Sequence, residues 1–163
     1  MTQTLWAPWR MDYILRDRSA DQGGCFLCLP ADHRGPLRER LVLCADELTL
    51  LIMNRFPYNN GHLMAAPRRH VASLSLTSEA ERLALTNLVA RATEVLDRLM
   101  KPDGYNLGVN QGLAAGAGVE DHLHFHVTPR WLGDVNYMTA LGETRVVPEH
   151  LMATWERLAG HFS

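Results

Sequence analysis

The sequence predicts an α+β fold built on a mostly antiparallel sheet. Several short apolar runs are bounded by turn residues, as strands are, and one long stretch has helical periodicity. The predicted strands gather around this helix without regular strand–helix alternation. Their order disfavours a doubly wound α/β fold, in which each strand is followed by a helix.

Three strands are expected before the helix. Residues 41–45 and 48–53 are short apolar runs separated by two acidic residues, and they predict a hairpin. Residues 54–61 have the Asn, Pro and Gly content of a loop. The chain is expected to return as a third strand at residues 62–66.

The long helix is predicted to begin at Ser78, because Ser78 and Glu81 match a capping box. Apolar residues then recur at helical spacing: Leu85, Leu88, Val89, Ala92, Val95, Leu96 and Leu99. Residues 102–104, Pro-Asp-Gly, end the helix, and alternation over residues 105–110 predicts a fourth strand. Residues 148–161 are expected to form a terminal helix.

Residues 121–128 place three imidazoles on alternate positions of a strand-like run. Side chains alternate between the faces of a strand, so His122, His124 and His126 should share one face and the apolar residues between them the other. Burying an imidazole ring costs free energy unless the ring forms hydrogen bonds or stays in contact with water. Such a row suits metal ligation, nucleophilic attack or anion binding, and the alternative is a solvated strand face rich in His.

A small-residue loop, residues 112–118, directly precedes the histidine row. Its backbone N–H groups could converge on phosphate oxygens as an anion nest. The following imidazoles would then meet the phosphorus, where a neutral ring can attack and form a phosphoramidate. The loop alone is weak support, because such turns often serve only as tight connections.

Cys25 and Cys28 have the spacing of one half of a tetrahedral zinc site. The two remaining ligands would have to come from elsewhere, with His70 and His122 as distant candidates and His33 as a local one. The alternative is a pair of ordinary thiols at a turn.

Length and composition favour one globular domain over residues 1–163, with an irregular N-terminal region at 1–40 that carries the cysteine pair and a core at 41–163. The net charge of -2 argues against broad nucleic-acid binding, which depends on clustered Lys and Arg. We expect no nucleic-acid partner.

No apolar run reaches the ~20 residues that span a bilayer, and the N-terminus lacks the pattern of a secretory signal. The three cysteines make a poor disulfide framework, and Cys44 suits a small core position. We therefore expect a cytoplasmic protein with reduced thiols and no membrane partner.

With these residues assembled, the chain resembles the histidine triad (HIT) superfamily. Residues 122–128 match its His-apolar-His-apolar-His-apolar-apolar motif, except that Thr128 fills the last position. Residues 54–62 look like the family's Asn-Arg-x-Pro-x-x-x-Gly-His segment, and residues 67–70 like the motif that follows it. Four further features are similar to bacterial diadenosine tetraphosphate phosphorylase-like members: residues 6–10, the Cys25/Cys28 pair, residues 115–118 and residues 129–131.

The resemblance implies a nucleotidyl hydrolase or transferase that cleaves a nucleoside polyphosphate, chiefly a diadenosine polyphosphate. His124 would attack the α-phosphate and form a nucleotidyl-histidine intermediate. His126 would contact the phosphate and help to stabilise its charge, and His122 would orient the site. The second step would use water or inorganic phosphate as the acceptor.

The resemblance also implies a ligand set and a substrate pocket. Cys25, Cys28, His70 and His122 would hold a structural zinc, because four protein ligands leave no open position to activate water. Five residues would contact the substrate, with Asn54 at the ribose, Ile52 at the base, and Asn110, Gly116 and Gly118 near the phosphates. No organic cofactor is implied.

One departure from the family pattern concerns the loop before the triad, where many hydrolase and phosphoramidase members carry Gln. This chain has Ala117 and Gly118 there, which leaves the acceptor open. The family fold is α+β with a five-stranded antiparallel sheet, which two subunits commonly extend into one, so a homodimer is implied. Alternative functions are a nucleoside phosphoramidase, a nucleotide-binding adaptor and a zinc-dependent interaction module.

Overall fold

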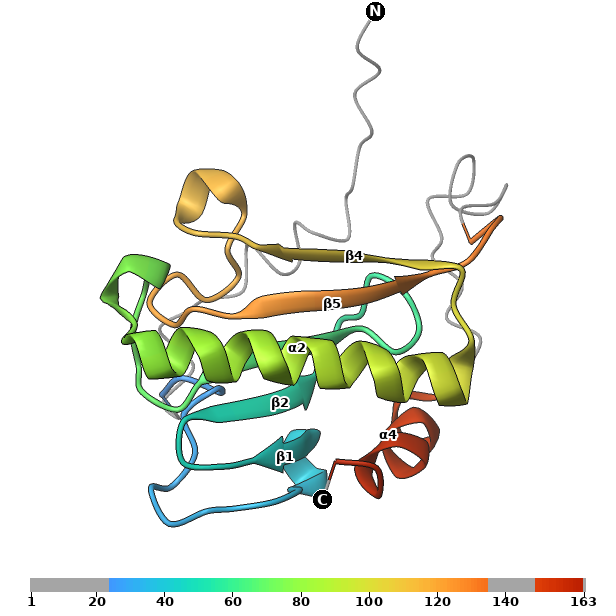
Figure 1. Ribbon diagram of the computed structural model, residues 1–163, viewed down its shortest axis with the longest axis horizontal. Helices are drawn as coiled ribbons and strands as arrows, with labels where there is room; N and C mark the ends of the chain where they lie inside the picture. Colours follow the sequence, from blue (N-terminus) through green and yellow to red (C-terminus); the bar gives the residue numbers. More distant parts are fainter. Residues whose placement is uncertain (1–23, 135–148, 163) are drawn as a thin grey trace, which may run out of the picture. The chain divides into compact units, whose positions relative to one another are not determined.

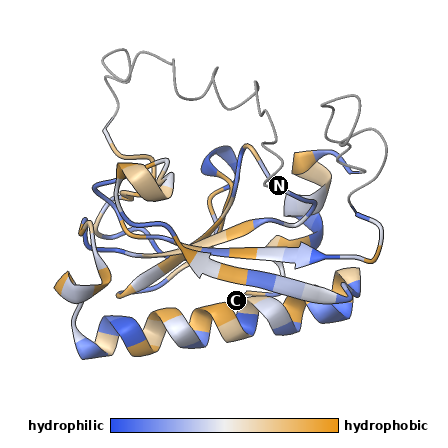
Figure 2. Ribbon diagram, turned by 90° about the horizontal axis from the view of Figure 1, so that it is seen from above, coloured by the Kyte–Doolittle hydropathy of each residue, from blue (hydrophilic) through white to orange (hydrophobic). Residues whose placement is uncertain are grey.

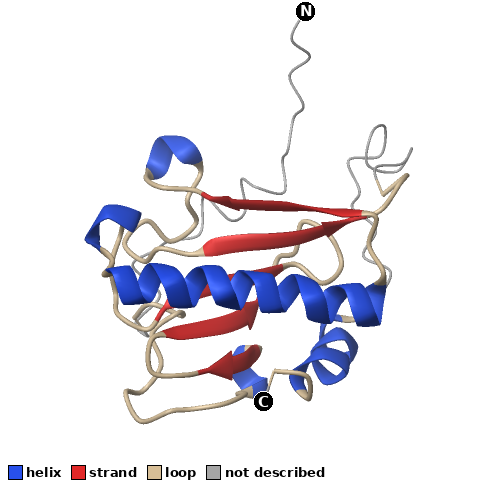
Figure 3. Cartoon of the chain, viewed as in Figure 1, coloured by secondary structure: helices blue, strands red, loops and turns tan. Residues whose placement is uncertain are grey.

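The structure is a computed structural model that describes residues 24–134 and 149–162. The family-like segment at residues 6–10 lies outside the described residues. All described elements lie in one compact unit, which comprises residues 25–134 and 149–162 of the described chain. A five-stranded sheet with one long helix and a C-terminal helix makes up this unit (Figures 1 and 3).

The sheet has the order β1-β2-β3-β5-β4, and every neighbouring pair is antiparallel. Its strands are β1 (Val42–Ala45), β2 (Thr49–Met53), β3 (Leu63–Pro67), β4 (Gly104–Val109) and β5 (Phe125–Arg130). The predicted α+β class and antiparallel sheet are confirmed. The first four strands begin and end within one residue of their predicted limits.

The histidine row departs from the prediction. Strand β5 begins at Phe125, so only His126 lies within it, and His122 and His124 lie in the segment before it. This segment does not join the β5 ladder, because the Leu123 N–H donates to the carbonyl of Val71 instead, with N···O at 2.7 Å. The three imidazoles therefore do not all lie within strand β5.

Helix α2 (Glu79–Met100) begins with the predicted capping box, since the Ser78 and Glu81 side chains each accept the other residue's backbone N–H. It lies across one face of the sheet and contacts β2, β3 and β5. Figure 2 shows hydrophobic and hydrophilic positions alternating along its length. Its buried apolar residues are Leu85, Leu88, Ala92, Val95 and Leu96, all within the predicted set.

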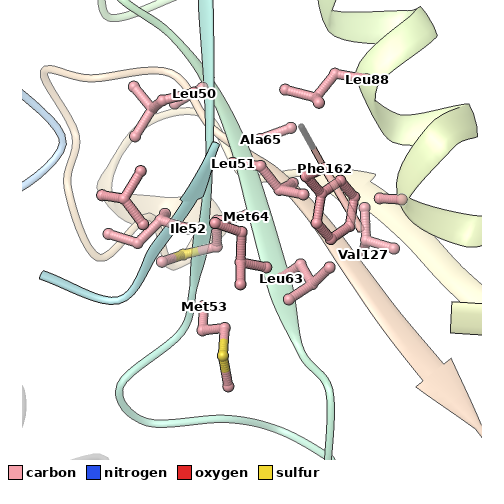
Figure 4. Close-up of a cluster of buried hydrophobic side chains, with 14 of the residues drawn as sticks. Leu50, Leu51, Ile52, Met53, Leu63, Met64, Ala65, Leu88, Val127 and Phe162 are labelled. Atoms are coloured by element: carbon pink, nitrogen blue, oxygen red, sulfur yellow. The ribbon is translucent and has the colours of Figure 1, made fainter. Parts of the chain in front are cut away.

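The core fills the space between α2 and the sheet. Figure 4 shows Leu51, Leu63 and Val127 on the side of Leu88, which belongs to α2. Successive strand residues alternate between faces, so their neighbours in sequence lie on the other side. His126 precedes Val127 and pairs with Met64, which places His126 on the sheet face away from α2.

The terminal helix α4 (Leu151–Ala159) confirms the predicted C-terminal helix. It packs against β1 and α2, and Leu158 and Phe162 are buried in the core. Among the described residues, no helix combines the length and hydropathy that a bilayer span requires.

An ion pair ties the start of α2 to the segment after β3. Glu81 is 5% exposed and accepts from Arg69, with Nε–Oε1 at 3.0 Å and Nη2–Oε2 at 2.8 Å. This pairing lowers the pKa of Glu81 to about 2, despite burial, which acts in the opposite direction. As the pH falls, Glu81 is therefore protonated in the unfolded chain before it is protonated in the folded protein. The stabilisation from the ion pair is full above pH 4.5 and is lost toward pH 2.

We predict that Glu81→Gln lowers the free energy of unfolding at pH 7 by about 0.5–1 kcal/mol, a modest value because Arg69 is largely exposed. Gln keeps an acceptor for the Ser78 N–H but loses the charge. Urea unfolding at pH 7 and pH 3 should show the difference from the wild type shrinking at pH 3. The control is Glu79→Gln, an exposed residue of the same turn. An equal difference at both pH values would contradict this account.

Candidate active site

The candidate site lies where the segment before β5 crosses the end of β3. His122 is fully buried, and its Nε2–H donates to the carbonyl of Pro67, the last residue of β3, at 2.8 Å. The neighbouring bond from Leu123 to Val71 continues this pairing. Two segments that are 55 residues apart in sequence are thereby held side by side.

His124 is held by a hydrogen bond at one ring nitrogen, and none of the described residues forms a hydrogen bond with the other. Its side chain is 3% exposed, and its Nδ1 lies 2.9 Å from the carbonyl oxygen of His122. A carbonyl can only accept, so Nδ1 carries the proton and Nε2 carries the lone pair. Burial lowers the pKa of His124 and outweighs the opposing effect of this hydrogen bond. His124 is therefore a neutral imidazole with a nucleophilic Nε2.

His126 has the opposite tautomer, set by a short chain of hydrogen bonds. The backbone N–H of Tyr58 donates to Nδ1 of His62 at 3.1 Å, so the proton of His62 is on Nε2. That Nε2–H donates to Nδ1 of His126 at 2.9 Å. His126 must then carry its own proton on Nε2, where it can donate to a negatively charged oxygen.

The rings of His124 and His126 lie close together, with centroids 5.0 Å apart in an edge-to-face arrangement. Burial lowers the pKa of His126 to about 4, and the neighbouring His124 adds to this effect. At neutral pH the site therefore offers one imidazole as a nucleophile and the next as a neutral hydrogen-bond donor.

The loop between β2 and β3 supplies the residues that surround His62. Asn54 accepts from the Phe56 N–H at 2.9 Å, and its Nδ2 lies 3.3 Å from Nδ1 of His62. This second donor also requires a lone pair on Nδ1 of His62. Ile52 is 3% exposed on β2, where the register joins it through Met64 to His126.

The expected anion nest forms only in part. Within residues 112–118, the N–H groups of Ala115 and Ala117 point to the carbonyl of Gly112, and that of Gly116 to Leu113. Three of the loop's donors are thus used to close a short 3-10 helix, Leu113–Ala115. Gly118 comes after this 3-10 helix, and its N–H forms no hydrogen bond with any described residue. Asn110 lies directly after β4, at the start of the same connection.

Four side chains expected as metal ligands do come together. The ligand atoms of Cys25, Cys28, His70 and His122 all lie within 4.8 Å of one another and could hold a metal ion. Nδ1 of His122 is 3.3 Å from Sγ of Cys25 and 3.6 Å from Sγ of Cys28, and Nδ1 of His70 is 3.3 Å from Sγ of Cys28. His33, the local candidate, is not in the group.

The three sulfur–nitrogen distances are close to those around a tetrahedral ion. Bonds of ~2.3 Å to sulfur and ~2.1 Å to nitrogen give edges of roughly 3.4–3.8 Å between ligands. His122 also donates its remaining N–H to Pro67, the arrangement that usually orients a metal-bound imidazole. Burial raises the pKa of the Cys28 thiol and the nearby Cys25 raises it further, so Cys28 would be a thiolate at neutral pH only with a cation beside it.

Sequence reasoning assigned no role to His62, although it belongs to the recognised segment at residues 54–62. The signal was therefore present, as a fourth histidine next to a glycine. The Tyr58 N–H and the carbonyls of Pro67 and His122 could not be found this way, because they are backbone groups that any residue carries.

Comparison with known proteins gives consistent matches. The model of the HIT domain family matches residues 38–131. A Mycobacterium tuberculosis protein named AP-4-A phosphorylase is 36% identical over 166 residues, which cover 96% of this chain and 83% of that protein. An adenosine 5'-monophosphoramidase of Schizosaccharomyces pombe is 26% identical over 117 residues, which cover 72% of this chain and 84% of that protein.

The fold has solved counterparts as well. The crystal structure of a Zn-bound histidine triad family protein from Mycobacterium smegmatis superposes with a TM-score of 0.61 at 24% identity, covering 74% of this chain and 82% of the other. The family match over more than half of the chain, together with the 36% identity along nearly all of it, shows that the chain belongs to the HIT domain family of nucleotide hydrolases and transferases.

Proposed function

We propose that this protein cleaves a dinucleoside polyphosphate, with diadenosine polyphosphates as the leading substrate class, through a covalent nucleotide on His124. The single observation that carries the proposal is the pair of opposite tautomers: a lone pair on Nε2 of His124 next to an N–H on Nε2 of His126. The relative named AP-4-A phosphorylase supports the choice of substrate.

In the first step, the lone pair of His124 Nε2 attacks the α-phosphorus. A nitrogen–phosphorus bond forms as the bond to the bridging oxygen breaks, and the leaving polyphosphate keeps that electron pair. The N–H of His126 donates to an oxygen of the α-phosphate, where charge is redistributed in the transition state. His124 is already neutral at pH 7, so no proton has to leave it before attack.

In the second step, an oxygen of the acceptor attacks the same phosphorus, and the nitrogen–phosphorus bond breaks to restore the lone pair of His124. Water as acceptor loses a proton to solution and yields a nucleoside monophosphate. Inorganic phosphate yields a nucleoside diphosphate instead. We propose phosphate as the acceptor on the strength of the phosphorylase relative.

The substrate contacts are part of the same proposal. Asn54 would bind a ribose hydroxyl with the donor and acceptor capacity left by its local bonds. Ile52 would line the base pocket. Asn110, Gly116 and Gly118 would border the phosphates, with the N–H of Gly118 among the donors that the loop's own closure does not use.

We propose zinc as the ion of the Cys25, Cys28, His70 and His122 cluster, because two thiolates and two imidazoles suit zinc and the matched mycobacterial structure is Zn-bound. All four positions are protein side chains, so the ion would have a structural role. It would join the cysteine turn to the segments that carry His70 and His122.

Other proposals follow from the family and the fold. Strand β4 is an edge of the sheet with exposed residues at its centre, and it would pair with a second copy in a homodimer. We propose that residues 1–163 form one domain of a cytoplasmic enzyme.

The alternative activity is a nucleoside phosphoramidase, which the matched Schizosaccharomyces pombe protein favours.

The His124→Asn variant tests the reaction, because Asn cannot form the nitrogen–phosphorus bond. Turnover of diadenosine tetraphosphate should fall at least about 10⁴-fold, with the fold retained. With phosphate present, the wild type should give ADP and ATP, and water as acceptor would give AMP and ATP. His161→Asn, at an exposed position, is the control. Retained turnover in the His124 variant would contradict the mechanism, and faster cleavage of a nucleoside phosphoramidate would favour the alternative.

The metal proposal is tested with cobalt(II), whose visible absorption reports thiolate ligation in a tetrahedral site. The wild type should bind one cobalt per chain, which zinc displaces, and Cys28→Ser should weaken binding about 10- to 100-fold. Cys44→Ser is the matched control, since Cys44 lies in β1 outside the cluster. Equal cobalt spectra for the two variants would show that Cys28 is not a ligand.

A further inference from the structure

We infer that Asp134, acting through Asn59, is a positioning residue that sets which nitrogen of His126 carries the proton. The inference rests on the proposed function, since it deepens the role given to His126. Asp134 lies four residues beyond the end of β5, outside the segments that resemble the family motifs.

Asp134 is held as a nearly buried, ionised acceptor. Its side chain is 9% exposed and forms a bidentate salt bridge with Arg130, with Nε–Oδ2 at 2.6 Å and Nη2–Oδ1 at 2.8 Å. Arg130 is itself fixed on the other side by Oδ1 of Asn106 at 2.6 Å, on β4. Because the bidentate salt bridge fixes the orientation of the carboxylate, its remaining lone pairs point in a fixed direction.

Asn59 uses this acceptor to anchor the loop between β2 and β3. Its Nδ2 donates to Oδ2 of Asp134 at 2.8 Å and to the carbonyl of Pro129 at 3.2 Å. Its Oδ1 accepts the N–H of Asn60 at 3.0 Å, and its carbonyl accepts the N–H of His62 at 3.2 Å. Every polar group of the Asn59 side chain is therefore engaged in holding the turn that leads to His62.

The remaining side of the turn is held by different contacts. The carbonyl oxygen of the Asn60 side chain accepts from the buried hydroxyl of Thr154 on α4 at 3.2 Å. Gly61 has φ +71°, and a Cβ there would lie 2.8 Å from Sδ of Met100 at the end of α2. These contacts fix the end of the turn, whereas the Asn59–Asp134 bond fixes its beginning, next to Tyr58.

The N–H of Tyr58 is the shorter of two donors to Nδ1 of His62, at 3.1 Å, and Nδ2 of Asn54 is the other, at 3.3 Å. Together they keep the proton of His62 on Nε2 and hence that of His126 on Nε2. If the anchor is lost, Tyr58 can move away, and the Asn54 contact alone holds the tautomer less firmly, so that a fraction of the molecules carries the proton of His62 on Nδ1. The bond between the two rings would then reverse, and Nε2 of His126 would present a lone pair rather than a donor to the substrate.

The test compares the wild type with Asp134→Ala, Asp134→Asn and Asn59→Ala. Long-range proton–nitrogen NMR spectra of the substrate-free protein distinguish a protonated from an unprotonated ring nitrogen. We expect His126 protonated on Nε2 in the wild type and a mixture of tautomers in Asp134→Ala and Asn59→Ala. Asp134→Asn keeps an oxygen acceptor for Asn59 and should restore the single tautomer.

The kinetic counterpart is a lower kcat, by roughly 10- to 100-fold, with little change in KM, because the lost donor acts mainly in the transition state. The control is Asp103→Ala, a carboxylate that accepts the N–H of Leu132, two residues before Asp134, at 2.7 Å and that forms no hydrogen bond to the described loop at residues 54–62. It should leave the tautomer and kcat unchanged.

An unchanged His126 tautomer in both Asp134→Ala and Asn59→Ala would overturn the inference. A mixture that is equally large in Asp103→Ala would do the same, because it would reveal only general loosening. If Asp134→Ala does not fold, Asn59→Ala alone decides, as it leaves the Arg130 pair intact. The NMR result needs no turnover, so a wrong substrate or mechanism would not be mistaken for a wrong positioning role.

Discussion

The chemistry of this site depends on one hydrogen bond, from Nδ1 of His124 to the carbonyl of His122. It assigns the lone pair of the proposed nucleophile, His124, to Nε2, and burial keeps that ring neutral at physiological pH. The carbonyl can do this only because His122 is itself fixed through its ring bond to Pro67 at the end of β3. His124 is thus oriented by a backbone carbonyl, whereas the histidine of a serine protease triad is oriented by a carboxylate.

His122 also connects the two parts of the site. Its Nδ1 faces the thiols of Cys25 and Cys28, while its carbonyl orients His124 two residues later. An ion in the cluster would therefore restrain the same residue that sets the tautomer of the nucleophile. On the opposite side, Arg69 holds the segment next to His70 against α2 through Glu81.

Much of the fold could be predicted because hydrophobic period and capping are local properties. Residues 41–66 gave three strands from apolar runs and turn chemistry, and Ser78 and Glu81 gave the start of α2. The start of β5 could not be predicted in this way, because the Leu123 N–H donates to the carbonyl of Val71, a partner far away in sequence. The metal cluster was anticipated through the family resemblance, whereas spacing alone had left His33 as an alternative ligand. The histidine tautomers could not be predicted from the sequence, because backbone donors and acceptors set them.

The most direct test of this account is the position of the covalent nucleotide. A rapid quench of the enzyme with diadenosine tetraphosphate, followed by digestion at high pH to preserve the nitrogen–phosphorus bond, allows mass spectrometry to locate the adduct and phosphorus NMR to identify the bonded nitrogen. The account predicts adenylate on Nε2 of His124. An adduct on Nδ1 of His124 or on another histidine, or turnover in which no adduct forms at all, would contradict it.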